Sequence, residues 1–460
     1  MKTSTSTIVT PWHIPSAVVA KVPAILLIGC LGFNLGGCHR PLDSAAMRDP
    51  GRFESIAATE NTEAAPTPAS LDTPALRERI LTHHPAVQAA AAKVFAAAAE
   101  QNTARSLPNP ELDGRYINTD TGGNVEAALL FPLPWSGRLG AAGKVADLDL
   151  ALARTALRAT RLAVLLELEK LLTELAWARH RLDLATELAD RSQQYASLAG
   201  ERRSASMADP LDVSLVLADA ARDQRFLART QETVPRLESR LAFLLGLDAA
   251  TTDYVISPPE LEHRPVPQDT LLALAGRHRD ALRLARLVYQ RAEWDAARIS
   301  RSRIPDLAVG PAYIKEGETG NLGVAFSLPL PIFNRGGGEY RAALARRDAA
   351  HTALQVEKRA LRSEIDLLNS RLGTVQIELE ALTGEALSAV EEAFDLARAR
   401  YNAGQIDVLR LLSAHRAFAE LKLEIIDLYL EQHQTWLALE KAVGWPLVSK
   451  LDPRLWEVDP

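Results

Sequence analysis

Hydrophobic residues along this chain recur with two periods, one typical of helices and one typical of strands. Long stretches rich in Ala, Leu, Arg and Glu predict helices far longer than those of most domains. The longest covers residues 144–199 without Gly or Pro, which predicts a helix of roughly 80 Å. Another runs from about Glu339 to Tyr401 and includes Gly373 and Gly384. Such helices are typical of coiled-coil assemblies.

Each long helix is followed by a short turn and a returning helix. The first turn covers residues 204–210, and the helix after it begins near Leu211 and meets Pro235, which predicts a kink. The second turn covers residues 401–405, and its returning helix occupies residues 406–443 without Gly or Pro. The chain is therefore expected to form two long helical hairpins.

Between the helices, each half contains two short segments in which large apolar residues alternate with small or polar ones. Gly323, Ala325 and Ser327 are such small or polar positions. Gly-containing turns at residues 119–124 and 316–321 join the segments, which predicts two β-hairpins. The apolar positions are Val125, Ala127, Leu129 and Phe131 in the first half and Leu322, Val324, Phe326 and Leu328 in the second.

Two interpretations fit these hairpins. They are ordinary amphipathic hairpins packed on helices, or they belong to a membrane barrel with the apolar face on lipid and the small face on a lumen. Four strands cannot enclose a water-filled interior, and an open sheet edge in lipid would leave backbone groups without hydrogen-bond partners. A membrane barrel therefore requires several chains.

The second half of the chain repeats the plan of the first. At an offset of 195 residues, Asp212 and Val213 match Asp407 and Val408. We expect a first repeat at residues 71–260, a second at 261–446 and a tail at 447–460. Matches at a constant offset of 197 residues include Pro108 with Pro305, Tyr116 with Tyr313, Gly123 with Gly320, Pro132-Leu133-Pro134 with Pro329-Leu330-Pro331, and Arg138 with Arg335.

The first residues have the pattern of a bacterial targeting segment. Positive charge precedes an apolar run at residues 22–33, which is shorter than the roughly 20 residues of a permanent membrane span. Leu35-Gly36-Gly37-Cys38 follows and is similar to a lipobox, whose Cys becomes the lipidated N-terminus. We expect a lipoprotein signal peptide at residues 1–37, acylation of Cys38, and a flexible tether at residues 38–70. The alternative is an ordinary signal peptide that happens to contain Cys38.

Composition and charge exclude several classes of partner and site. The 460 residues carry a net charge of -6, which argues against nucleic acid as a partner. The two Cys are Cys30 and Cys38, and removal of the signal peptide would leave only the acylated one, so no disulfide or Cys-based metal site is expected. The ten His are scattered without metal-ligand spacing, so no metal site is expected either.

The chain also lacks the signatures of an enzyme. His278-Arg279-Asp280 has the letters of a kinase catalytic loop, but no Gly-rich phosphate loop or matching Lys segment accompanies it. Nucleophile-elbow, metalloprotease and dinucleotide-binding patterns are absent from the sequence. We therefore expect no catalytic residue and no cofactor.

Taken in order, the motifs resemble those of the TolC-like outer-membrane efflux protein family. The resemblance covers residues 74–444. Each motif alone is weak, whereas the ordered set in duplicate is specific. The motifs are Asn109-Pro110-Glu111-Leu112, Phe131-Pro132-Leu133-Pro134, the segment 327–335, and Tyr401-Asn402-Ala403-Gly404 followed by Asp407 and Leu411-Leu412.

The resemblance implies a mainly α fold with a small membrane β-barrel. It implies a homotrimer in which four strands per chain make a twelve-stranded barrel, continued by a long α-helical barrel through the periplasm. Such ducts passively conduct substrate received from an inner-membrane efflux transporter and a periplasmic adaptor protein. Lipidated members occur in the family, which agrees with anchoring of Cys38 in outer-membrane lipid. The exported substrate is not identified.

The two helix turns are expected to be the periplasmic tips, which would dock the adaptor and close the resting duct. In a trimer each tip Asp would occur three times and form a ring of negative charge. Structural explanations stay open: Gly404 as a helix-ending residue, and Asp212 and Asp407 as first-turn acids favoured by the helix dipole. The candidate residues are Ala208, Asp209, Asp212, Ala403, Gly404, Gln405 and Asp407.

Two other classes of protein stay open beside an exit duct. A periplasmic adaptor also contains a helical hairpin, but one hairpin between split β-domains is expected there rather than two in tandem. A structural coiled-coil lipoprotein would share the long helices but would lack lipid-facing strands.

Overall fold

The computed structural model describes residues 70–119, 122–205, 209–247, 253–254, 266–316, 319–447 and 451–452. The chain divides into two units, Met1–Thr67 and Pro68–Pro460, and the fold described here belongs to the second. The predicted signal peptide and Cys38 lie outside the described residues, whereas Ser70 begins the short strand β1 (Ser70–Leu71), which pairs in parallel with β4 (Asp253–Tyr254).

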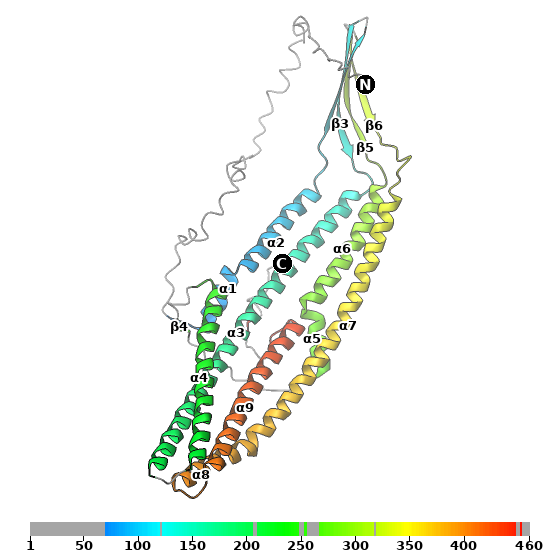
Figure 1. Cartoon of the computed structure of the whole chain (residues 1–460). Coiled ribbons are helices and arrows are strands. Elements are labelled where there is room, and N and C mark those ends of the chain that lie inside the picture. Colours follow the sequence, from blue (N-terminus) through cyan, green and yellow to red (C-terminus); the bar gives the residue numbers. More distant parts are fainter. Residues whose placement is uncertain are drawn as a thin grey trace, which may run out of the picture. The chain divides into compact units, whose positions relative to one another are not determined.

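The two halves of the chain form the same series of elements. Two consecutive helices lead into a β-hairpin, and a long helix and a returning helix follow it (Figure 1). The first series is α1 (Thr73–His83), α2 (Pro85–Ala104), β2 (Glu111–Thr119), β3 (Gly122–Leu133), α3 (Arg138–Ser204) and α4 (Pro210–Leu245). The second is α5 (Gln268–His278), α6 (Asp280–Ser302), β5 (Leu307–Glu316), β6 (Thr319–Ser327), α7 (Gly337–Ala381), η2 (Leu382–Ala386), α8 (Leu387–Asn402) and α9 (Val408–Val443).

The long helices form where the sequence pattern predicts them, although α3 extends beyond residues 144–199 at both ends and the second long helix is interrupted at one glycine. The helix α3 has 67 residues, and α4 continues through Pro235. The second long helix is interrupted at η2, where Gly384 has a ψ of -128° that is not helical. Gly373 lies within α7, so only one of the two glycines in this stretch interrupts the helix. None of the helices in the described part of the chain has a stretch long and apolar enough to cross a membrane.

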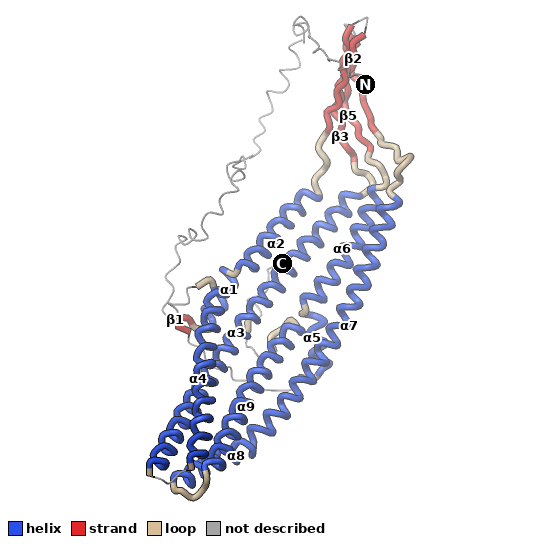
Figure 2. The backbone as a smooth tube through the Cα atoms, viewed as in Figure 1, coloured by secondary structure: helices blue, strands red, loops and turns tan. Residues whose placement is uncertain are grey.

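The four longer strands form one antiparallel sheet in the order β2-β3-β5-β6, so β3 and β5 join the two hairpins. The sheet lies at one end of the helices, and the ends of the helical hairpins lie at the other (Figure 2). The strand register carries the predicted apolar face across the sheet, because Phe131 lies opposite Val309 and Val309 lies opposite Phe326. On this face Phe326 is 78% exposed and Leu322 is 87% exposed.

The other face of the sheet carries mostly small or polar residues, together with Leu130 and Ile314. Ser327 lies opposite Ala308, and Arg115 lies opposite Glu126. Two opposite faces of this kind are expected of strands that separate lipid from a water-filled lumen. The structure therefore favours the membrane interpretation of the hairpins over packing against helices.

Candidate functional site: the two helix turns

The predicted tip residues come from two turns at the end of the helices farthest from the sheet. One turn joins α3 to α4, and the other joins α8 to α9 (Figure 1). Buried apolar side chains of all four helices pack together behind these turns. They include Tyr195, Val213, Val216, Phe394, Tyr401, Val408 and Leu411. This core holds the two turns next to each other.

The turn after α8 ends in a Schellman motif centred on Gly404. The N–H of Gly404 donates to the carbonyl oxygen of Tyr401 at 2.9 Å, and the N–H of Gln405 donates to that of Arg400 at 2.9 Å. Gly404 has a φ of +73°, a left-handed conformation that favours glycine. It is exposed, and a Cβ added there would meet no atom of the described residues within 4 Å. The glycine therefore ends the helix and leaves its outer surface open.

Two carboxylates cap the returning helices. Asp209 is the N-cap of α4, and its side chain accepts a hydrogen bond from the N–H of Leu211 at 2.8 Å. Asp407 is the N-cap of α9 and accepts from the N–H of Arg410 at 3.0 Å. Both are exposed, and a cap of this kind contributes about 1 kcal/mol. Asp212 lies in the first turn of α4, where the helix dipole favours an acid.

The N-cap residues of α4 and α9 do not correspond to each other in the sequence alignment of the two repeats. The sequence offset pairs Asp212 with Asp407, and the burial of Val213 and Val408 agrees with it, since they are 6% and 2% exposed. The capping role, however, belongs to Asp209 in the first repeat. The helix α4 begins about one turn earlier than α9 relative to the shared pattern, so the capping Asp also comes earlier.

Arg202 joins the two turns, and the sequence analysis missed it. Its guanidinium group leaves the end of α3 and donates to the backbone carbonyl oxygens of Tyr401 at 2.7 Å and Asn402 at 3.2 Å. It also lies over the Tyr401 ring, 4.3 Å from the centroid. A cation at the last carbonyls of a helix opposes the negative end of its dipole. Arg202 lies between Glu201 and Arg203 in the sequence. This local sequence gives no signal of the contact, because the partner lies in the other repeat.

The structure thus brings together most of the predicted tip residues. Ala403, Gly404, Gln405 and Asp407 lie in one turn, while Asp209 and Asp212 lie at the other. Ala208 and Cys38 are outside the described residues. The observed roles of Gly404, Asp209 and Asp407 are structural, and these roles leave their exposed surfaces available to a partner.

Comparison with known proteins identifies the family. The model of the outer membrane efflux protein family matches residues 76–247 and 272–445, one stretch in each repeat. The chain belongs to this family. Its fold class and its function as an outer-membrane channel of efflux systems are therefore those predicted from sequence, and the adaptor and coiled-coil alternatives do not apply.

Individual relatives and solved structures agree with this family assignment. The chain is 24% identical over 350 residues to the cobalt-zinc-cadmium resistance protein CzcC of Cupriavidus metallidurans, covering 74% of this chain and 82% of that protein. It is 30% identical over 312 residues to outer membrane protein OprJ of Pseudomonas aeruginosa, covering 63% of each. The fold resembles the crystal structure of VceC from Vibrio cholerae with a TM-score of 0.69 and 21% identity, covering 80% of this chain and 95% of that one.

Proposed function

We propose that this chain works as a homotrimeric exit duct, docked by a periplasmic adaptor and supplied by an inner-membrane efflux transporter. The sheet carries this proposal. It has four strands with β2 and β6 at its open edges, and one of its faces is apolar and exposed. An open edge cannot remain unpaired in lipid, so β6 of one chain must pair with β2 of the next. Three copies give a closed barrel of twelve strands around the polar face.

The proposed duct is passive. The family consists of efflux proteins rather than enzymes, and a water-filled path needs neither a cofactor nor reaction chemistry from this chain. The inner-membrane transporter supplies the energy. What the chain itself supplies is closure at rest and opening when the adaptor docks.

The two helix turns are the proposed gate and docking surface. The exposed Gly404 offers a surface without a side chain, which allows an adaptor hairpin to approach the backbone closely. Asp209 and Asp407 are exposed at the same end of the molecule and place carboxylates there in each of three chains. Ala208, Asp212, Ala403 and Gln405 flank them in sequence and belong to the proposed surface.

We expect Gly404→Trp to abolish export while membrane assembly stays intact, because the indole fills the open surface against which a partner would dock. Export is measured by complementation of a host strain that lacks this chain. The strain is challenged with cobalt, zinc and cadmium salts, because the relative CzcC is named for resistance to these metals, and with a panel of antibiotics.

Gly404→Ala is the matched control, since it carries the cost of the left-handed φ without the bulk. Wild-type export by Gly404→Trp would exclude docking through this surface, whereas an equal loss in Gly404→Ala would show that the loss does not come from the bulk of the indole. Asp407→Asn tests the carboxylate ring separately, because Asn keeps the helix cap and removes the charge. Unchanged conductance and ion selectivity of Asp407→Asn in planar bilayers would argue against the ring.

We also propose that Cys38 anchors the mature chain to the outer membrane through acyl chains, on the basis of the lipobox-like Leu35-Gly36-Gly37 before it. Mass spectrometry of the N-terminal peptide of the purified protein is expected to show an acylated Cys38. An unmodified peptide that reads through Gly37-Cys38-His39 would contradict the anchor.

A further inference from the structure

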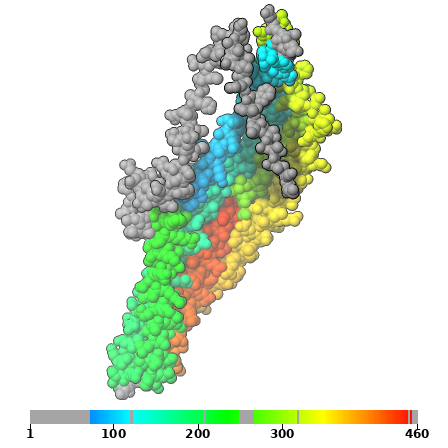
Figure 3. Space-filling view, turned by 45° about the horizontal axis from the view of Figure 1, so that its top comes forward, coloured from blue at the N-terminus to red at the C-terminus, as the bar shows by residue number. Residues whose placement is uncertain are grey.

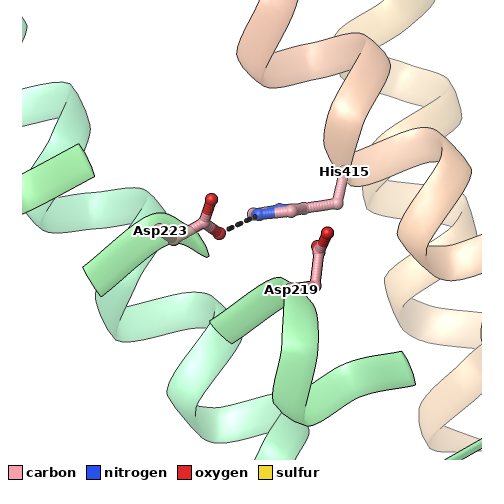
Figure 4. A group of neighbouring side chains, drawn as sticks. All are labelled: Asp219, Asp223 and His415. Atoms are coloured by element: carbon pink, nitrogen blue, oxygen red, sulfur yellow. Dashed lines mark hydrogen bonds and ion pairs between the residues drawn. The ribbon is translucent and has the colours of Figure 1, made fainter. Parts of the chain in front are cut away.

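Three polar side chains meet inside the apolar packing between α4 and α9. Asp219 and Asp223 are four residues apart, so they lie on the same face of α4, and His415 reaches them from α9 (Figure 4). The exposed fractions of the three residues are 2%, 4% and 0%. The two helices run side by side along this part of the molecule (Figure 3). Buried polar groups in such a position need partners.

The three side chains are close enough to share one ion. His415 Nε2 lies 2.9 Å from Asp223 Oδ2, and one ligand atom from each residue lies within 4.8 Å of the others. The ligand atoms of a tetrahedral zinc site, with bonds of about 2.0 Å, lie about 3.3 Å apart. The ligand atoms of this cluster therefore lie within about 1.5 Å of the separations that one shared zinc ion requires.

Within the described residues, two buried atoms of the cluster lack a partner, and the carboxylate oxygen of the two is free to bind an ion. Asp219 Oδ2 and His415 Nδ1 are buried and have no hydrogen-bond partner within the part of the chain that the structure describes. Arg416 uses both Nε and Nη2 on Asp219 Oδ1, each at 2.9 Å, and so does not satisfy Oδ2. Arg222 also faces Asp219, at 3.9 Å from Oδ1. A buried carboxylate oxygen that is left unpaired is costly.

We propose that Asp219, Asp223 and His415 bind a divalent cation of the zinc type and that this ion links α4 to α9. Two carboxylates and an imidazole form a ligand set that suits zinc better than magnesium or calcium, which prefer oxygen ligands alone. Three protein ligands leave a fourth position for water. The sequence analysis expected no metal site because the ten His are scattered along the chain. His415 lies 192 residues from Asp223, in the other repeat, so sequence spacing does not reveal this cluster.

Aromatic rings shield the proposed site from water. The ring centroids of Tyr195 and Phe394 lie 6.0 and 5.8 Å from that of His415. Tyr195 comes from α3 and Phe394 from α8, so all four helices of the tip enclose the histidine. Burial raises the pKa of the Tyr195 hydroxyl above its ordinary value, as expected of a group that water does not reach. An apolar shell of this kind strengthens the attraction between a metal ion and its ligands.

The position of the site gives the ion a mechanical role. Asp219 lies nine residues into α4 from Pro210, or about 14 Å from the tip. An ion bound to both helices opposes any separation of the first hairpin from the second. This effect on hairpin separation rests on the proposed opening of the tips, whereas binding of the cation to the three side chains does not.

Zinc binding to the full-length protein in detergent tests the site directly. After the protein has been stripped of metal with a chelator, zinc chloride is titrated by calorimetry, and the bound metal is counted by mass spectrometry. We expect one tight zinc per chain, a rise in the thermal unfolding midpoint with zinc, and an imidazole ligand in the X-ray absorption spectrum. His415→Ala and Asp223→Asn are each expected to weaken binding at least tenfold, while His351→Ala, an exposed histidine on α7, binds as the wild type does.

Arg416→Ala separates a metal site from an ion-pair network. Removing the guanidinium group leaves all three ligands in place and frees Asp219 Oδ1, so zinc is expected to bind more tightly. An ion-pair network alone would give no zinc binding in any variant and a loss of stability in Arg416→Ala. The proposal is overturned if the wild-type protein binds no tight zinc, or if His415→Ala binds as the wild type does. Conductance with and without zinc then tests the effect on opening separately.

Discussion

Replacing Gly310 with Ala is expected to abolish assembly of the channel in the membrane. A Cβ at Gly310, in β5, would lie 1.8 Å from the carbonyl oxygen of Leu129 and 2.8 Å from its carbonyl carbon, in β3. Both are main-chain atoms, so no side-chain rotation relieves the overlap. The two strands must move apart, and they form the junction through which one hairpin pairs with the other. Opening this junction would create two more unpaired edges in lipid.

Heat-modifiable migration on gels and native mass spectrometry in detergent measure the effect, because both separate assembled trimer from unassembled chain. Gly323→Ala, on the neighbouring strand β6, is the matched control, since a Cβ there meets no described atom within 4 Å. The expected result is loss of trimer for Gly310→Ala alone. Normal assembly of Gly310→Ala would show that the two strands do not approach each other so closely in the membrane.

The fold could be predicted from sequence because its signals are local and repeated. Stretches without Gly or Pro, such as residues 144–199, indicate long helices because intrinsic preference summed over many residues is informative. The alternation around Phe326 determines which side chains share a face of the sheet, since successive side chains point to opposite faces. Duplication then supplied each signal twice. The register of its strand places Phe326 in one row with Val309 and Phe131, so the predicted apolar residues share one face of the sheet.

The contacts of the site could not be predicted in the same way because each depends on a partner in the other repeat. Arg202 caps the end of α8 and is followed by Arg203, and nothing in their sequence distinguishes the two. His415 meets Asp223 only because α4 and α9 pack together. Gly373 and Gly384 show the same limit within one helical stretch, where only the second adopts a backbone conformation that is not helical.

Phe326→Arg is expected to impair membrane assembly far more than Ser327→Arg does. The two residues are neighbours in β6, so their depths in the membrane differ by only about 3.3 Å, but their side chains point to opposite faces. Phe326 is 78% exposed on the apolar face, whereas Ser327 lies on the polar face that would line the lumen. An Arg on the lipid face near the middle of a bilayer costs about 2–4 kcal/mol, and one facing water in a lumen costs much less.

Urea titrations of both variants folded into lipid vesicles measure this difference as a shift in the free energy of unfolding. Because the substituted side chain is Arg in both, its size, charge and strand propensity cancel in the comparison, and the remaining difference comes from the face and from the residue that was replaced. Val324→Arg and Ala325→Arg repeat the test two residues away on the same two faces. Equal losses within both pairs would mean that neither face meets lipid, and the sheet would then have to lie outside the membrane. A larger loss in Ser327→Arg and Ala325→Arg would reverse the assignment and place the apolar face toward the inside of the barrel.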